Sequence, residues 1–314
     1  MSILAVGSIG LDTIQTPFGQ VTDALGGSAT FFSIAASFFS PVNLVAIVGS
    51  DFPQETLNYL ESRGISTEGI EKANGKTFRW KGLYENDMNA AKTLSTDLNV
   101  FQTFQPKIPI HLKKSPFVFL ANIDPELQLN VLEQMEKPKL IGCDTMNLWI
   151  QSKPKELNEL LKKVDILLLN DGEARQLTGI TNLVKASYDL IKRGPKIVVI
   201  KKGEHGAILA TKDFFFVAPA FPVEDVFDPT GAGDCFAGGF FASLITSEHF
   251  WNESSLRSSV IFGTVLASYN VESFSFDRLK KLSKEEIYHR YTKFKQFTHF
   301  EPADMSTTFP PLSV

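Results

Sequence analysis

The sequence has few of the residues that build disulfide frameworks or metal clusters. Its 314 residues include two cysteines, Cys143 and Cys235, too few for a disulfide framework or a four-ligand site, and its five histidines show no metal-ligand spacing. A basic excess is also missing: 31 Lys and Arg against 35 Asp and Glu leave a net charge of −4 and no positive field for nucleic acid. The N-terminus lacks the basic region of a signal peptide. These absences predict a cytoplasmic protein that does not bind nucleic acid.

Charge is absent from residues 24–50, a stretch long enough to span a bilayer. Gly26-Gly27, Pro41 and Asn43 interrupt this stretch. It therefore divides better into a buried helix at 28–39 and a strand at 42–48, and no membrane segment is expected.

What the chain does have is a regular alternation of short apolar runs and helical patterns. The expected strands are residues 4–8, 43–48, 117–121, 139–143, 165–169 and 196–201. Helical periodicity falls at 28–39, 54–63, 125–135, 155–164, 173–178 and 183–193. Short buried strands separated by helices predict an α/β fold with a doubly wound, mostly parallel central sheet and helices on both faces. Ligands of such sheets bind beyond the carboxyl ends of the strands.

Residues 77–103 break this rhythm. KTFRWKGLY and KTLSTDLNVF are β-rich runs with polar residues interleaved, and the polar loop ENDMNAA joins them. We expect a hairpin insertion, joined by residues 13–21, that forms a small β lid over a cleft. An edge hairpin without a lid function is the alternative.

The stretch DPTGAGD places Asp228 and Asp234 around a glycine turn and directly before an apolar helix expected from about residue 234 to 245. The N–H groups of Gly231, Ala232 and Gly233 would point outward at the helix N-terminus, where the dipole favours an anion such as phosphate. Asp234 lies in the first turn, where a carboxylate can accept a proton from an attacking hydroxyl. The P-loop pattern is absent, and Phe236 stands where a dinucleotide fingerprint needs glycine.

DPTGAGD and the apolar helix after it closely resemble the signature of the ribokinase-like (PfkB) carbohydrate kinases. Further resemblances follow in order along most of the chain: Gly26-Gly27 before a helix, NDGE at 170–173 after a strand, KKGEHG at 201–206, Asp12 beyond the first strand, and the β insertion. The resemblance implies one ribokinase-like domain over 1–314 with a lid formed by about 13–21 and 77–103. It also implies an ATP-dependent kinase that phosphorylates a hydroxymethyl group of a sugar or ribonucleoside, and a homodimer formed through the lid.

The resemblance also implies roles for individual residues. Asp234 would be the base, and the 231–233 turn the anion hole. Asp12 and Gly26-Gly27 would bind the acceptor substrate. The residues implied at the nucleotide and its magnesium are Asn170, Glu173, Lys201, Gly203 and Gly206. Asp228 and the Thr230 carbonyl would hold a monovalent cation such as potassium.

Structural alternatives stand beside these roles. Asp234 would suit a helix N-cap, Asp228 a turn, Asn170 with Glu173 a capping pair, and Asp12 a loop.

Phe31 departs from the family pattern, because many sugar kinases carry asparagine there. Its ring would either stack on a nucleobase, which favours a nucleoside over ribose or fructose, or lie in the core. A sugar-only kinase remains the alternative, followed by a non-catalytic or dinucleotide-dependent α/β protein.

Overall fold

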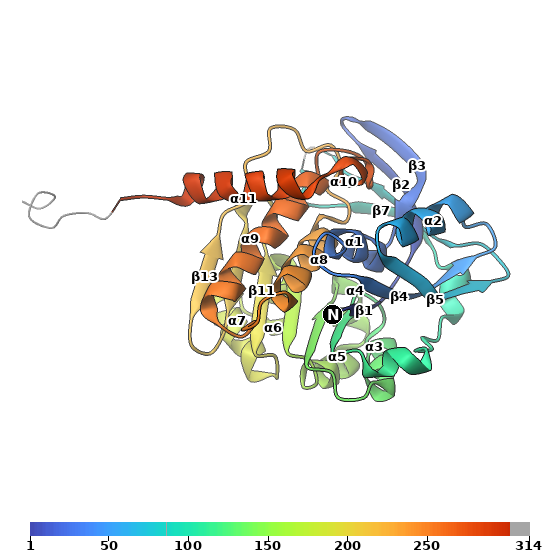
Figure 1. Ribbon diagram of the computed structural model, residues 1–314, viewed down its shortest axis with the longest axis horizontal. Coiled ribbons are helices and arrows are strands. Elements are labelled where there is room, and N and C mark those ends of the chain that lie inside the picture. Colours follow the sequence, from blue (N-terminus) through green and yellow to red (C-terminus); the bar gives the residue numbers. More distant parts are fainter. Residues whose placement is uncertain (86, 302–314) are drawn as a thin grey trace, which may run out of the picture.

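The computed structural model describes residues 1–85 and 87–301, which contain two β-sheets (Figure 1). The larger sheet has nine strands in the order β13-β12-β11-β10-β9-β8-β1-β4-β5. Their bounds are β1 Ile3–Val6, β4 Val42–Gly49, β5 Ile65–Ala73, β8 Phe117–Leu120, β9 Leu140–Asp144, β10 Ile166–Asn170, β11 Ile197–Lys201, β12 Ala207–Ala210 and β13 Phe215–Ala218. The strands from β11 to β5 pair in parallel, and only β12 and β13 are antiparallel. The predicted mostly parallel sheet is confirmed.

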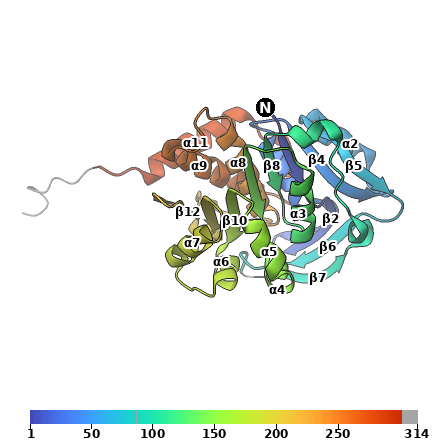
Figure 2. The ribbon, with the colours of Figure 1, turned by 90° about the horizontal axis from the view of Figure 1, so that it is seen from below.

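Both faces of this sheet are covered by helices, as continuous apolar strands require. In β1, Ile3 and Ala5 belong to one core cluster, whereas Leu4 and Val6 belong to the other. The first cluster is completed by α1 Ser28–Ala36, α8 Ala232–Ile245 and α9 Glu253–Asn270. The second is completed by α3 Pro125–Gln134, α5 Pro154–Leu161, α6 Asp171–Thr178 and α7 Leu183–Lys192, which lie on the opposite side of the sheet (Figure 2). The core is therefore two apolar layers separated by the sheet.

The remaining helices are α2 Gln54–Ser62, α4 Asn147–Ser152, α10 Asp277–Lys281 and α11 Lys284–Thr298. A capping box of Ser283 and Glu286 begins α11, as the sequence SKEE at 283–286 predicts. Arg290 of α11 places its guanidinium 3.4 Å from the centre of the Tyr269 ring and forms an ion pair with Glu272 at 2.6 Å. These contacts fasten α11 to the end of α9. The last dozen residues, whose sequence predicts loose order, lie outside the described residues.

The smaller sheet contains the segments predicted to form a lid, and we call it the lid; its strands lie in the order β3-β2-β6-β7. They are β2 Gly10–Thr16, β3 Gly19–Gly26, β6 Phe78–Leu83 and β7 Lys92–Asp97. The sheet thus begins earlier than the predicted 13–21 segment, at Gly10, and β3 continues to Gly26. Residues 99–103 form a 3₁₀ turn instead of strand. Arg79 of β6 bonds Asp51, which follows β4, at 2.8 Å, so a charge-assisted contact joins the lid to the larger sheet.

No helix within residues 1–85 and 87–301 has the length and apolar character needed to cross a membrane. The uncharged stretch 24–50 is instead the end of β3, the buried helix α1 and the buried strand β4.

Candidate active site

The glycine turn and its helix are formed as the sequence predicts. Gly231 is the N-cap of α8 and has φ 75°, a left-handed conformation that favours glycine. The N–H of Ala232 donates to the Pro229 carbonyl at 3.1 Å. Gly231 and Gly233 have no partner for their N–H groups in the described part of the chain. The N–H groups left for an anion are therefore those of the two glycines. The N–H of Ala232, which was predicted to be a third donor, is already bonded within the turn.

Asp234 lies half-buried in the first turn of α8. Burial, followed by the nearby charges of Asp144, Glu173 and Asp12, raises the pKa of its carboxyl to about 8, while Lys201 opposes the rise. A carboxyl with a pKa near neutrality is suited to accept and return a proton at physiological pH. It does not cap the helix, because no side-chain cap bond exists at this N-terminus.

Lys201, at the end of β11, places its ammonium beside the glycine turn. A Cβ added at Gly233 would lie 3.1 Å from Lys201 Nζ, and Nζ bonds Asp144 Oδ2 at 2.6 Å. Burial alone would lower the pKa of Lys201, but Asp144, Glu173 and Asp234 outweigh it and hold the pKa above its usual value. A charged ammonium thus lies next to the free N–H groups, which makes this corner of the site favourable for phosphate.

Asn170 and Glu173 form a capping box at the start of α6. Each backbone N–H donates to the other residue's side chain at 2.7 Å. Burial and the charge of Asp144 raise the pKa of Glu173 to about 7, partly offset by Lys201. The capping alternative is therefore present in the structure, and it orients a buried carboxyl toward the charges around Lys201.

Asp12, in lid strand β2, is buried against the double-glycine turn. A Cβ at Gly26 would lie 1.9 Å from Asp12 Oδ2, so only glycine leaves room for the carboxylate. Asp12 Oδ1 is buried and has no hydrogen-bond partner among the described residues. Burial and the charge of Asp228 raise the pKa of Asp12 to about 7. An unpartnered buried carboxylate oxygen is costly to leave empty, and a substrate hydroxyl would satisfy it.

Phe31 lies in the core, with an exposed fraction of 1%. Its ring packs against Phe276 with 4.2 Å between ring centres, and a Cβ at Gly231 would lie 2.3 Å from it. The interpretation of Phe31 as a stacking partner for a nucleobase is therefore wrong in this structure, because the ring is covered by protein. It supports the glycine turn from behind.

Asp228 is fully buried, and both of its carboxylate oxygens accept backbone N–H groups: Thr230 at 2.9 Å and Ser275 at 3.0 Å. The Thr230 carbonyl accepts from Asn270 Nδ2 at 2.8 Å. Burial raises the pKa of Asp228, and these hydrogen bonds oppose the rise. No lysine, arginine or histidine among the described residues pairs with this carboxylate, and oxygen ligands of this kind suit a hard cation.

The lid reaches the site at two places. Tyr84, directly after β6, accepts a hydrogen bond from Thr230 Oγ1 at 3.2 Å. Asn89 in the lid loop donates to Glu204 at 3.4 Å, and a Cβ at Gly203 would lie 2.2 Å from Asn89 Oδ1. Gly203 begins, and Gly206 follows, the short 3₁₀ turn after β11, and both have positive φ. The lid thus touches both the glycine turn and the predicted nucleotide segment.

Two residues of this site were not predicted, Asp144 and Tyr84. Asp144 ends β9, and a polar residue directly after the apolar run 139–143 was a signal that could have identified it. Tyr84 ends the lid run KTFRWKGLY, and no sequence feature near it distinguishes it from the other aromatic residues of this run as a site residue.

A lid, a glycine turn at a helix N-terminus and a carboxyl beside it, all at the carboxyl edge of a doubly wound sheet, define a ribokinase-like kinase. Residues 4–279 match the pfkB family of carbohydrate kinases, and the chain belongs to that family. It is a phosphotransferase that acts on an alcohol group.

One curated relative and two solved structures of the same fold are similar to the chain. A cytidine kinase of Thermococcus kodakarensis is 31% identical over 249 residues, covering 77% of this chain and 88% of the relative. A Burkholderia thailandensis nucleoside kinase solved in complex with inosine has a TM-score of 0.75 at 18% identity, covering 96% of this chain and 98% of that chain. A Salmonella enterica aminoimidazole riboside kinase complexed with aminoimidazole riboside and an ATP analog has a TM-score of 0.73 at 17% identity, covering 93% and 100%. These findings favour the kinase over the dinucleotide-dependent and non-catalytic alternatives.

Proposed function

We propose that this protein transfers the γ-phosphate of ATP to the hydroxymethyl group of a ribonucleoside, with cytidine the first candidate acceptor. The observation that carries the proposal is Asp234, which directly follows the glycine turn and lies close enough to Asp12 for the two charges to interact. Asp12 in turn has a buried carboxylate oxygen, Oδ1, without a partner among the described residues. The nucleoside class is supported by the cytidine kinase relative and by nucleoside-bound structures of the same fold.

In the proposed reaction, Asp12 accepts hydrogen bonds from ribose hydroxyls and holds the acceptor beside Gly26-Gly27. Asp234 takes the proton of the hydroxymethyl group as its oxygen attacks the γ-phosphorus. The bond from oxygen to phosphorus forms, the bond to the β–γ bridging oxygen breaks, and ADP leaves with those electrons. The N–H groups of Gly231 and Gly233 and the ammonium of Lys201 stabilise the charge on the transferring group.

Asn170 and Glu173 are proposed to order Mg²⁺ and its waters at the phosphates, with Asp144 keeping Lys201 in place. Carboxylate and amide oxygens are the ligands that Mg²⁺ prefers, and the ion supplies charge neutralisation when bound. Glu173→Gln then needs more magnesium for half-maximal rate at unchanged acceptor affinity, and a magnesium titration that matches the parent contradicts this role. Gly203 and Gly206 are proposed to lie along the nucleotide.

The proposal is tested by ADP release from ATP and Mg²⁺ with cytidine, adenosine, inosine, ribose and fructose as acceptors. Asp234→Asn is expected to lose at least about 10²-fold in kcat, the usual scale for a lost general base. Calorimetry is expected to show that acceptor binding is retained and that nucleosides bind better than ribose or fructose.

Asp225→Asn is the matched control, because it removes an exposed carboxylate earlier in the same loop. Near-normal turnover of Asp234→Asn takes that residue out of the chemistry. Micromolar binding of a free sugar, with no response to any nucleoside, contradicts the proposed acceptor class.

A further inference from the structure

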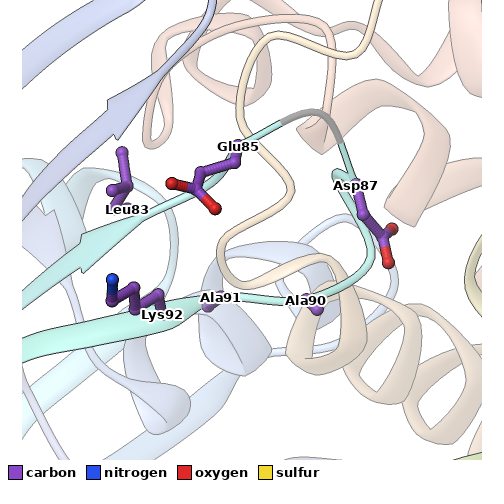
Figure 3. Close-up of a pocket in the computed structure, with 6 residues that line it drawn as sticks. All are labelled: Leu83, Glu85, Asp87, Ala90, Ala91 and Lys92. Atoms are coloured by element: carbon purple, nitrogen blue, oxygen red, sulfur yellow. The ribbon is translucent and has the colours of Figure 1, made fainter.

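Tyr84 is a lid residue whose side chain is buried against the larger part of the protein. Its N–H donates to the Gln15 carbonyl at 2.8 Å, which extends the pairing of β6 with β2 by one residue. Leu83 and Glu85, with Lys92 on the opposite strand, line an open hollow of about 370 Å³ on the hairpin (Figure 3). Because side chains alternate along an extended chain, Tyr84 points away from this hollow. Its exposed fraction is accordingly 7%.

The hydroxyl of Tyr84 contacts the residue that begins the glycine turn. Thr230 directly precedes Gly231, and three residues hold its polar groups: one in the same turn, one at the end of α9 and one in the lid. Its N–H bonds Asp228 at 2.9 Å, its carbonyl bonds Asn270 at 2.8 Å, and its hydroxyl donates to Tyr84 at 3.2 Å. Two of these restraints come from the body and exist whatever the lid does. The third comes from the lid.

The surroundings keep the phenol protonated. Burial raises the pKa of Tyr84 to about 12, the bond from Thr230 opposes this rise, and the charges of Asp228, Asp12 and Asp234 add to it. Three charged groups of the site thus lie close enough to act on Tyr84. A neutral hydroxyl can accept the Thr230 bond without adding a further negative charge to this acidic cluster.

We propose that Tyr84 is a positioning residue: when the lid covers the site, its hydroxyl holds Thr230 and thereby sets the glycine turn for phosphoryl transfer. This inference rests on the proposed function, in which that turn binds the transferring group. It explains how lid closure and assembly of the anion site are joined by one hydrogen bond between residues 146 positions apart. The third restraint on the turn is then complete only while the lid covers the site, which favours transfer inside the covered site over transfer to water.

The test is a double-mutant cycle on kcat with Tyr84→Phe, Thr230→Val and the double variant. Each single change removes one hydroxyl and is expected to lower kcat by about 3- to 10-fold, the range of a neutral hydrogen bond, with both KM values changed little. Because both hydroxyls serve the same bond, the double variant is expected to match the single variants instead of multiplying their losses.

Tyr59→Phe is the matched control, since it also removes a buried tyrosine hydroxyl, one with no partner among the described residues. It is expected to keep the parent kcat. An unchanged kcat in Tyr84→Phe, a rise confined to KM, or losses that multiply in the double variant each overturn the inference. Asp234→Asn in the same assay distinguishes failure of the Tyr84 inference from failure of the proposed function. If the proposed function is wrong, Asp234→Asn stays active; if only the Tyr84 inference is wrong, Asp234→Asn still loses activity.

Discussion

Asp12, Glu173 and Asp234 are three acids whose pKa values lie well above the ordinary range, at about 7, 7 and 8. In each case burial is the largest cause, and neighbouring carboxylates add to it. Lys201 is the cation that offsets the charge of two of them, Glu173 and Asp234. The site is thus arranged for catalysis at some expense of stability, because an ionised carboxylate there lacks the solvation it has in the unfolded chain.

This arrangement predicts how stability depends on pH. The folded protein binds more protons than the unfolded chain between the ordinary carboxyl pKa near 4 and the raised values near 7 to 8. These carboxyls therefore favour the folded state most when they are protonated. Their contribution to the free energy of unfolding is complete below about pH 4 and is lost as pH rises through about 8. We expect the melting temperature of the protein without ligands to fall from about pH 5 to pH 8, and Asp234→Asn or Glu173→Gln to reduce this slope.

Differential scanning fluorimetry across this pH range measures the effect. Glu248→Gln serves as the control, since it changes an exposed carboxylate beyond the other end of α8. A melting temperature that rises with pH in the parent, or a slope that both site variants keep, would show that these acids are ionised as easily in the folded protein as in the unfolded chain.

At the scale of elements, the turn before α8 and the segment after α9 form one unit. Asn270 bonds the Thr230 carbonyl, Ser275 bonds Asp228, and the Phe227 N–H donates to the Val271 carbonyl at 2.8 Å. The Ser275 hydroxyl also donates to the Leu25 carbonyl at 2.6 Å, which ties this unit to the double-glycine turn. A change at Asp228 is therefore transmitted to the anion site.

We propose that a monovalent cation binds at Asp228 and the Thr230 carbonyl and is the counter-charge of this unit. Activity is then expected to be higher in potassium chloride than in tetramethylammonium chloride at equal ionic strength, because the organic cation is too large to enter. Steady-state rates in the two salts measure the effect, and Asp228→Asn should remove the difference. Equal rates of the parent in both salts would leave Asp228 a turn residue that accepts two backbone bonds.

At the scale of the whole molecule, the lid presents an unusual surface. Every residue of β7 is exposed, and Phe18, Leu94 and Leu98 on the lid are exposed by 47%, 44% and 43%. The sheet also ends in two edge strands, β3 and β7 (Figure 1). Exposed edges and apolar side chains together favour association with another chain.

We therefore propose that two copies of the protein associate through their lids. Sedimentation velocity at micromolar concentration is expected to show a dimer, and Leu94→Glu to shift it toward monomer by placing a charge in the interface. Val184→Glu, at a side chain 43% exposed on α7, is the matched control and is expected to stay dimeric. A monomeric parent, or a Leu94→Glu variant that remains a dimer, contradicts the proposal.

Much of this molecule follows from local sequence patterns. Six of the seven parallel strands, most of the helices that cover them and the helix after DPTGAGD were predicted, because apolar periodicity and glycine turns act over a few residues. The two edge strands β13 and β5, the strand β12 beside β13 and the helix α9 were not predicted. Asp234 and the glycine turn were predicted for the same local reason: the helix N-terminus itself brings the carboxyl and the N–H groups together.

Tertiary structure alone decided which distant residues meet there. Asp144 and Lys201 lie 57 positions apart and meet because β9 and β11 flank β10 in the sheet. Tyr84 reaches Thr230 because β6 pairs with β2 in the lid. Phe31 lies behind Gly231 instead of facing a ligand, because the packing of α1 on α8 leaves its ring covered by protein. Sequence patterns report what a segment does by itself, whereas these contacts depend on strand order and side-chain packing between segments.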